Sequence, residues 1–235
     1  MVSDPAPRAP AMGAKGHWES VYRAKRVDEV SWFQREPAVS YGLIRRVAPE
    51  TNARIIDVGG GASSLVDALA GAGYSAVTVL DISGAALGRA QGRLGAAASL
   101  VTWLESDVLV GSLPAGAFDV WHDRAVFHFL TEQSERAAYM AQIRQSLRPN
   151  GFVVMATFAE DGPAMCSGRP VVRYSPLTLH DELGNLTNLT NLTNLTNLTN
   201  LTNLTNLTNL TNRRTLRTDE PFNPCQPEHP GLRKR

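Results

Sequence analysis

The sequence predicts an α/β fold: a doubly wound, mostly parallel, Rossmann-like sheet with helices on both faces. Between residues 53 and 159, short runs rich in β-branched residues alternate with segments of helical spacing. These runs are apolar on both faces, as in parallel sheets that helices cover on both sides. A glycine turn, "GGGAS" at 59–63, directly follows the first run. In such sheets a ligand binds at the carboxyl ends of the strands, where this turn lies.

The chain of 235 residues has room for one domain of ordinary size, which we expect at 16–184. Before it, residues 1–15 form a Pro/Ala-rich leader that is expected to be disordered and has no apolar stretch of the signal-peptide type. An aromatic segment follows at 17–34, and Pro37 favours the start of a helix.

The alternating elements then follow in order. Helices are expected to begin near Ser63, Ser83 and Thr131, and a last one near 175–184. In the first of these, residues 65, 68, 69 and 72 share one face. The strands expected between them are 54–58, 76–82, 100–107, 117–123 and 151–158.

The composition changes abruptly after the last expected helix. "NLT" repeats nine times at 185–211, and a period of three matches neither the strand period of 2 nor the helical period of 3.6. Asn and Thr are also weak helix formers. We expect this low-complexity repeat, and the Pro-rich basic tail at 212–235, to be disordered.

Bulk composition excludes several classes of protein. A formal net charge of +1 with no basic stripe argues against a nucleic-acid partner. No apolar run approaches the ~20 residues that span a bilayer, so no membrane role is expected. The two cysteines, Cys166 and Cys225, form no metal-binding or disulfide pattern. These observations favour a cytoplasmic protein without a metal site.

Three acidic residues end three successive strands: Asp57, Asp81 and Asp107. Asp57 precedes the glycines in a D-x-G-x-G arrangement, and Asp81 stands 20 residues after Gly61, where a carboxylate can accept hydrogen bonds from both ribose hydroxyls. Asp107 is placed to reach the amino group of an adenine. Any one of them could simply cap a turn. Three along one sheet edge favour a nucleotide site.

At this point the sequence resembles the class I S-adenosylmethionine-dependent methyltransferases. "DVGGGAS" is similar to their glycine motif, "VLDIS" to their ribose-binding strand end and "ESDV" to their adenine-contacting segment. "FDVWHDRAVFHFL" and "LRPNGFVVMATF" resemble the fourth strand, the following helix and the fifth strand. "HWESVY", "EVSWFQ" and "CSGRPVVRY" are similar to a small bacterial group within that family.

The resemblance implies S-adenosyl-L-methionine as cofactor and an unidentified small-molecule or protein methyl acceptor. It implies that Asp57 organises the glycine loop and the ammonium group of the cofactor, and that Asp81 holds its ribose. His122 would lie beside the methionine portion. The cofactor-binding residues that it implies are Asp57, Gly59, Gly61, Asp81, Ile82, Asp107, Val108 and His122.

Methyl transfer mainly requires alignment, and a base is needed only where the acceptor must lose a proton. His122 and Asp123 in "WHDR" are the candidate catalytic residues. Alternatively, Asp123 pairs with Arg124 or caps a turn, and His128 packs within its helix. The resemblance also implies a lid over the site, formed by Trp18, Tyr22, Trp32 and Phe33.

The chain departs from the family at its C-terminal edge. The sheet of the family ends in an antiparallel hairpin, where this chain has NLT repeats. We therefore expect the final β-hairpin to be missing and the fifth strand to expose an apolar edge. An inactive, truncated relative with a vestigial site is one alternative. An NAD(P)-dependent oxidoreductase is another, although the turn reads G-x-G-x-x-S and lacks the third glycine.

Overall fold

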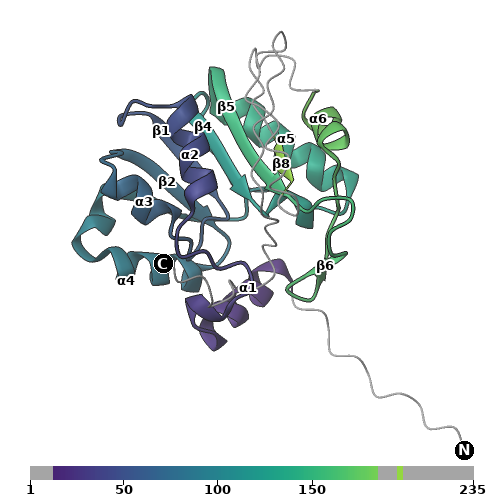
Figure 1. The fold of residues 1–235 in the computed structure, drawn as a ribbon, viewed down its shortest axis with the longest axis horizontal. Coiled ribbons are helices and arrows are strands. Elements are labelled where there is room, and N and C mark those ends of the chain that lie inside the picture. The colour runs from purple at the N-terminus through teal and green to yellow at the C-terminus, as the bar shows by residue number, and fades with distance from the viewer. Residues whose placement is uncertain (1–12, 185–194, 198–235) are drawn as a thin grey trace, which may run out of the picture.

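The computed structural model describes residues 13–184 and 195–197 (Figure 1). A six-stranded sheet with the order β3-β2-β1-β4-β5-β8 forms its centre, and all its described strand pairs are parallel. The expected doubly wound, Rossmann-like fold is confirmed. The strands of this sheet are β1 (Arg54–Val58), β2 (Ala76–Asp81), β3 (Val101–Glu105), β4 (Phe118–Arg124), β5 (Leu147–Thr157) and β8 (Leu195–Asn197).

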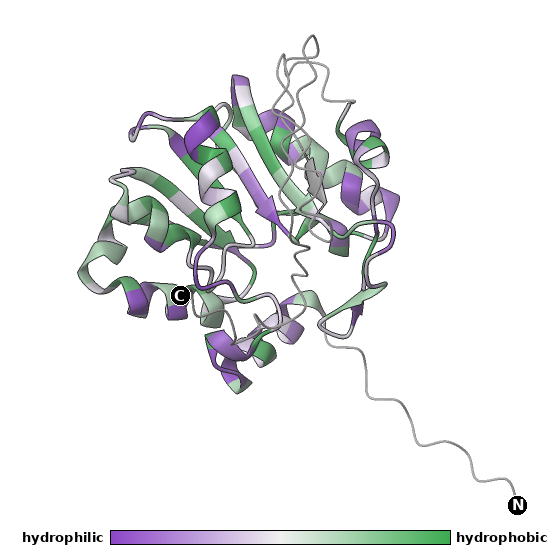
Figure 2. Cartoon of the chain, viewed as in Figure 1, coloured by the Kyte–Doolittle hydropathy of each residue, from purple (hydrophilic) through white to green (hydrophobic). Residues whose placement is uncertain are grey.

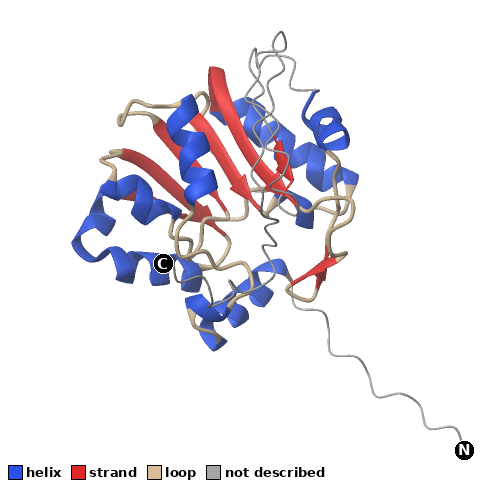
Figure 3. Cartoon of the chain, in the orientation of Figure 1, coloured by secondary structure: helices blue, strands red, loops and turns tan. Residues whose placement is uncertain are grey.

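Helices cover both faces of the sheet (Figure 3). A small antiparallel pair, β6 (Met165–Cys166) and β7 (Arg169–Pro170), lies outside it. The helices are α1 (Ala14–Ala24), α2 (Ala38–Val47), α3 (Leu65–Gly71), α4 (Gly84–Leu94), α5 (Gln133–Ser146) and α6 (Pro176–Gly184). Short 3-10 turns occupy η1 (Val27–Glu29), η2 (Gly95–Leu100) and η3 (Phe127–Phe129).

The strand period of two divides the core into two layers. Ile55 of β1 packs with α2, α3 and α4, whereas Ile56 packs with α5 and α6. Val120 and Trp121 of β4 separate in the same way, because successive side chains of a strand point to opposite faces. Figure 2 shows hydrophobic residues concentrated along these strands. Both faces are therefore buried, as the apolar runs predict.

The boundaries differ from the sequence expectation at several places. Helix α1 begins at Ala14, two residues before the expected domain, and β5 begins at Leu147 rather than near Gly151. Ser83 caps α4, since its Oγ accepts a hydrogen bond from Ala86 N at 3.1 Å. Among the described residues, no helix is both long and apolar enough to cross a bilayer.

The edge beyond β5 is partly covered, contrary to the expectation of a bare strand. Leu195–Asn197, within the NLT repeat, pairs in parallel with Met155–Thr157. Backbone pairing at an exposed edge needs no particular side chains, so a repeat without amphipathic period can still supply it. The other residues of the repeat, together with 1–12 and 212–235, lie outside the described residues. The missing hairpin therefore stays a prediction.

Candidate functional site

The glycine turn brings the backbone close to the side chains of Asp57 and Asp81. Gly59 and Gly61 have φ of +67° and +42°, which L side chains rarely adopt. A Cβ on Gly60 would lie 2.5 Å from Asp57 Oδ2, so the middle glycine is required by space. A Cβ on Gly61 would similarly lie 2.7 Å from Asp81 Oδ2. The turn thus packs directly on both carboxylates.

Asp57 belongs to a buried chain of hydrogen bonds. The Asp57 Oδ1 and His122 Nδ1 atoms are 2.7 Å apart, and His122 Nε2 lies 2.9 Å from Ser40 Oγ. Asp57 and His122 are 2% and 3% exposed, and Ser40 on α2 is 8% exposed. Parallel pairing of β1 with β4 sets Asp57 directly opposite His122. Both ring nitrogens of His122 are therefore engaged within the protein.

This geometry does not favour the expected catalytic role of His122, which stays a prediction. A base needs a nitrogen within reach of the proton that it removes. The two nitrogens of His122 bond to Asp57 and Ser40 instead. His122 lines a small cavity together with Asp57 and Gly59, which we call the smaller cavity. A place in this cavity is consistent with the expected position beside the cofactor.

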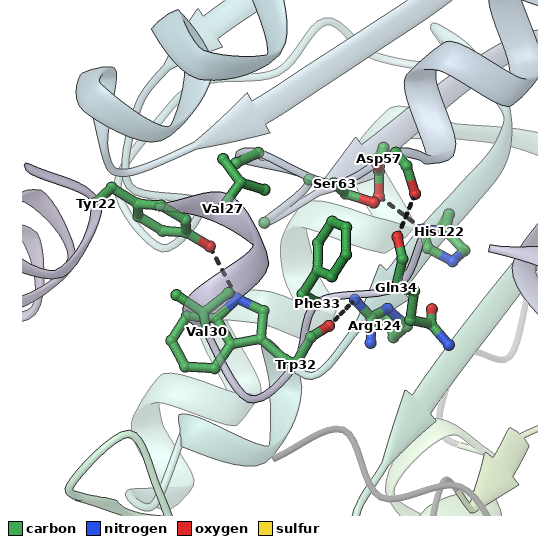
Figure 4. Close-up of a pocket in the computed structure, with 14 residues that line it drawn as sticks. Tyr22, Val27, Val30, Trp32, Phe33, Gln34, Asp57, Ser63, His122 and Arg124 are labelled. Carbon is green, nitrogen blue, oxygen red and sulfur yellow. Dashed lines mark hydrogen bonds and ion pairs between the residues drawn. The ribbon is translucent and has the colours of Figure 1, made fainter. Parts of the chain in front are cut away.

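At the smaller cavity, two side chains of opposite charge each have one buried atom without a hydrogen-bond partner in the described part of the chain. Asp57 Oδ2 and Arg124 Nη1 have no hydrogen-bond partner within the described residues. Arg124 Nη2 donates to the carbonyl of Trp32 at 2.9 Å (Figure 4), and burial lowers the pKa of the Arg124 guanidinium. This cavity has a volume of about 50 Å³, about the room of two waters at ~30 Å³ each. It fits a small polar group rather than a ring.

A second, larger cavity of about 210 Å³ adjoins the first, since Gly59 and Arg124 line both. Four more of the expected cofactor residues meet there, Asp81, Ile82, Asp107 and Val108, whereas Gly61 lines neither cavity. Asp107 Oδ1 accepts from Leu109 N at 2.9 Å, and Asp81 Oδ1 from Ser83 N at 2.8 Å. Each keeps a second oxygen that these bonds do not use. Burial raises the pKa of Asp81 to about 7, with the charge of Asp57 adding to the shift.

The hydrogen bonds of Asp123 favour a structural role, and its expected catalytic role stays a prediction. Its carboxylate accepts hydrogen bonds from Val126 N at 2.9 Å, Phe127 N at 3.0 Å and the Tyr139 hydroxyl. Asp123 is fully buried and lines neither cavity. Burial raises its pKa to about 6. It therefore closes the turn after β4, which is the capping alternative that its sequence position left open.

The aromatic segment before the sheet covers the cavities. Trp18, Tyr22 and Trp32 line the larger cavity and Phe33 the smaller one. Trp32 Nε1 donates to the Tyr22 hydroxyl at 2.9 Å, and the rings of Trp18 and Trp32 meet edge to face with centroids 5.6 Å apart. Figure 4 shows this segment lying against Arg124. These positions agree with the lid that the resemblance implies.

His128 lines neither cavity, whereas Cys166 lies at the wall of the larger one. His128 is fully buried between Phe129 and Phe158, and burial lowers its pKa to about 3. Cys166 lines the larger cavity and is disulfide-bonded, so the expectation of no disulfide is wrong at this residue. Disulfides are rare in reducing compartments, which counts against the cytoplasmic location that stays a prediction.

Sequence reasoning missed Ser40, Gly60 and Arg124. Gly60 could have been recognised, because a third glycine in the turn had no assigned role. Arg124 carried a weaker signal: an arginine directly after a buried strand has to place its charge somewhere. Ser40 gave none, since it lies 17 residues before Asp57 and 82 before His122.

Comparison with known proteins gives one family match. Residues 55–151 match the family described as a methyltransferase domain. That range holds Asp57, the glycine turn, Asp81, Asp107, His122 and Arg124. No curated protein matches the chain.

Solved structures show the same fold at low sequence identity. A protein solved for the conversion of a disulfide bond into a thioacetal group during echinomycin biosynthesis aligns with a TM-score of 0.60 and 21% identity, over 73% of this chain and 77% of its own. The 1,6-didemethyltoxoflavin-N1-methyltransferase of Burkholderia thailandensis, with 1,6-didemethyltoxoflavin and S-adenosylhomocysteine bound, gives 0.57 and 18%, over 78% and 81%.

An S-adenosylmethionine-dependent methyltransferase from Mesorhizobium loti aligns with a TM-score of 0.53 and 21% identity, over 64% of this chain and 81% of its own. At 18–21% sequence identity, the similarity to these solved structures shows the fold alone. The family match indicates which kind of domain residues 55–151 resemble. Residues 55–151 match a methyltransferase domain, and the chain has the fold of the S-adenosylmethionine-dependent methyltransferases.

Proposed function

We propose that the protein binds S-adenosyl-L-methionine across the two cavities and transfers its methyl group to a small-molecule acceptor. One pair of residues carries this proposal: Asp57 and Arg124 both line the smaller cavity, and each has a buried side-chain atom, Oδ2 and Nη1, without a hydrogen-bond partner within the described residues. Buried charges without partners are costly. A ligand with an ammonium and a carboxylate group satisfies both, and an α-amino acid head has these two groups.

The larger cavity supplies what an adenosine needs. Asp81 offers a carboxylate at the end of β2 for two ribose hydroxyls, and Asp107 a carboxylate at the end of β3 for an adenine amino group. Ile82 and Val108 give apolar surface for the ring. Because Gly59 lines both cavities, an amino acid head and an adenosine joined through one sulfur atom suit the pair.

S-adenosylmethionine supplies a methyl group on a positively charged sulfur, which is already activated for transfer. The remaining task of the protein is to orient the reactants and exclude water. The rings of Trp18, Tyr22 and Trp32 close the larger cavity, and aromatic faces favour a nearby cation. The glycine turn lets the backbone approach without a side chain in between.

The acceptor has to attack without a dedicated base. The carboxylates lining the larger cavity are Asp81 and Asp107, which have cofactor roles here, and Glu135, which accepts from Glu132 N at 3.2 Å. An acceptor with a lone pair available at neutral pH therefore fits best. The aromatic lid beside the larger cavity favours a small molecule over a protein side chain. The Burkholderia relative was likewise solved with a small molecule beside S-adenosylhomocysteine. The narrower likeness to the small bacterial group stays a prediction.

Both alternatives fit the site less well. In an oxidoreductase of the Rossmann type, the pyrophosphate lies at the glycine turn. The Asp57 carboxylate next to Gly60 would repel that pyrophosphate. A vestigial site has no need to keep two residues of opposite charge beside one cavity, each with a buried atom that lacks a hydrogen-bond partner within the described residues.

The test is a set of thermal melts of the full chain with S-adenosylhomocysteine, NADH or no ligand. At ~100 times its dissociation constant, a ligand adds about 2.7 kcal/mol, or about 5–10 °C for a chain of this size. We expect that shift with S-adenosylhomocysteine only, and its loss in Asp81→Ala. A shift with NADH alone would contradict the proposal. A cooperative melt that neither ligand shifts would support the vestigial alternative.

A further inference from the structure

A buried serine completes the chain of hydrogen bonds behind Asp57. Ser40, His122 and Asp57 come from α2, β4 and β1, and join through contacts of 2.9 and 2.7 Å. We infer that Ser40 is a positioning residue, which holds His122 so that Asp57 keeps one oxygen free for the ammonium group of the ligand. This inference rests on the proposed function.

The order Ser–His–Asp also occurs in hydrolases, where the serine attacks an acyl group. That use does not fit here. Ser40 lines neither the smaller nor the larger cavity, so its hydroxyl has no place to meet a substrate carbonyl. The end of the chain that faces a cavity is Asp57, whose Oδ2 lies against Gly60 and lacks a partner. The series of hydrogen bonds from Ser40 through His122 therefore acts on Asp57.

The hydrogen-bond chemistry fixes a direction along this chain. An ionised carboxylate can only accept, so His122 Nδ1 carries the proton that bonds to Asp57 Oδ1. In the neutral ring, Nε2 is then an acceptor and the Ser40 hydroxyl is its donor. With Oδ1 engaged, Oδ2 is the carboxylate oxygen of Asp57 that is left for a ligand. The carboxylate fixes the tautomer, and the Ser40 hydroxyl fixes the orientation of the ring toward Asp57.

Ser40 stands at a position where an apolar residue would otherwise be expected. Ser40 and Ile44 are the buried residues of α2, one helical turn apart on the same face. A buried hydroxyl is unfavourable unless it is hydrogen-bonded, and the partner of Ser40 is His122. Without the hydroxyl, Nε2 would be buried without a donor. The ring would then lose the contact that holds Nδ1 toward Asp57.

The first test compares two ligands that differ only in the amino acid head. 5′-Methylthioadenosine keeps the adenosine and the sulfur of S-adenosylhomocysteine but lacks its ammonium and carboxylate groups. By isothermal titration calorimetry we expect Ser40→Ala to weaken S-adenosylhomocysteine about tenfold, the size of one misplaced charge-assisted hydrogen bond. The affinity for 5′-methylthioadenosine should change by less than about twofold, since Asp81 and Asp107 are untouched.

Ser146→Ala is the matched control. Ser146 is also a fully buried helical serine, whose Oγ bonds to the Gln142 carbonyl at 2.6 Å on α5. Its loss should leave both affinities unchanged. Ser40→Thr, which keeps the hydroxyl, should retain the preference for S-adenosylhomocysteine, and it serves as the informative variant where Ser40→Ala does not fold.

The second test needs no cofactor. Nitrogen-15 correlation spectra of the histidine side chains report which ring nitrogen carries the proton and how fast that proton exchanges with water. We expect the Nδ1 proton of His122 to exchange slowly in the ligand-free wild type and faster in Ser40→Ala, where the ring is no longer held toward Asp57. An unchanged exchange rate together with unchanged affinities would overturn the inference. Equal weakening of both ligands would overturn it as well, because that indicates general damage.

These outcomes separate the inference from the proposed function. A wild-type protein that binds 5′-methylthioadenosine as tightly as S-adenosylhomocysteine would contradict the amino acid site itself. A wild type that prefers S-adenosylhomocysteine, with Ser40→Ala behaving identically, would contradict only the role of Ser40.

Discussion

Asp57 and Asp123 lie almost side by side on neighbouring strands, yet their surroundings differ. In the β1–β4 register Asp57 faces His122, and Asp123 faces Val58. Both carboxylates are buried, at 2% and 0% exposure. Asp123 accepts three hydrogen bonds from the protein, whereas Asp57 accepts one from His122 and keeps Oδ2 unpaired.

The difference comes from the chain that follows each strand. After β4 the backbone turns back, so that the N–H groups of Val126 and Phe127 reach Asp123. After β1 the three glycines keep side chains away from Asp57 and leave a cavity beside it. Residue type and strand position therefore do not decide whether a buried carboxylate serves the fold or a ligand. The loop geometry decides it.

Removing Asp123 should give the largest effect, and on stability alone. Asp123→Ala leaves two buried N–H groups and the Tyr139 hydroxyl without their acceptor. We expect a loss of about 3–5 kcal/mol in the free energy of unfolding, measured in urea. The ratio of affinities for S-adenosylhomocysteine and 5′-methylthioadenosine should stay as in the wild type. A changed ratio with normal stability would break the comparison.

Asp57→Asn should show the opposite pattern. The amide oxygen can still accept from His122 Nδ1, but an NH₂ group replaces the charged Oδ2 that faces the cavity. Because a donor then meets the ammonium group of the ligand, we expect the affinity for S-adenosylhomocysteine to fall about 10–100-fold by calorimetry. The melting temperature should fall far less than in Asp123→Ala.

The larger cavity should respond to pH through Asp81, whose pKa is raised to about 7. Hydrogen bonds from ribose hydroxyls favour the carboxylate form, so binding is strengthened as Asp81 loses its proton. With a pKa near 7, the ionised fraction rises about tenfold between pH 6 and pH 8. Both S-adenosylhomocysteine and 5′-methylthioadenosine should gain affinity by about that factor, since both carry the ribose.

Asp81→Asn checks this assignment in two ways. The variant should lose the pH dependence of binding. It should also melt at a higher temperature than the wild type at pH 8. The folded-state pKa of Asp81 lies above the ordinary value of ~3.9, so ionising it in the fold costs stability as pH rises toward 7. A variant that melts lower and keeps the pH dependence would assign that dependence to another group.

The lid should give the smallest effect. Trp32→Phe keeps an aromatic ring but removes the Nε1 hydrogen bond to the Tyr22 hydroxyl. Since a neutral hydrogen bond contributes about 1 kcal/mol, we expect both ligands to lose about threefold to fivefold in affinity. A loss confined to S-adenosylhomocysteine would instead tie Trp32 to the amino acid head, through its carbonyl contact with Arg124.

Much of the fold follows from the sequence because its signals are local. The apolar runs predict β1 to β5, and the alternation with helices predicts their parallel pairing. The placement of the proposed cofactor residues Asp57, Asp81 and Asp107 follows from the strand ends, because parallel strands bring these side chains to one edge of the sheet. β8 was not predictable, because its pairing depends on a free edge and not on a pattern in the repeat.

The roles of the residues around β4 could not be read from the sequence. His122 and Asp123 are adjacent, and either could serve as a base on residue type alone. Their partners, Ser40 and Tyr139, lie far away in the chain and meet them only through the packing of α2 and α5 on the sheet. Arg124 likewise gained its role from the lid carbonyl and the cavity.

The central claim is that the smaller cavity holds an amino acid head between Asp57 and Arg124. Titration of the wild-type chain with S-adenosylhomocysteine and with 5′-methylthioadenosine tests it most directly. Two charge-assisted contacts at about 1.5–3 kcal/mol each predict that S-adenosylhomocysteine binds at least about 100-fold more tightly. Equal affinities would contradict the claim, because they would mean that neither unpaired charge meets the ligand.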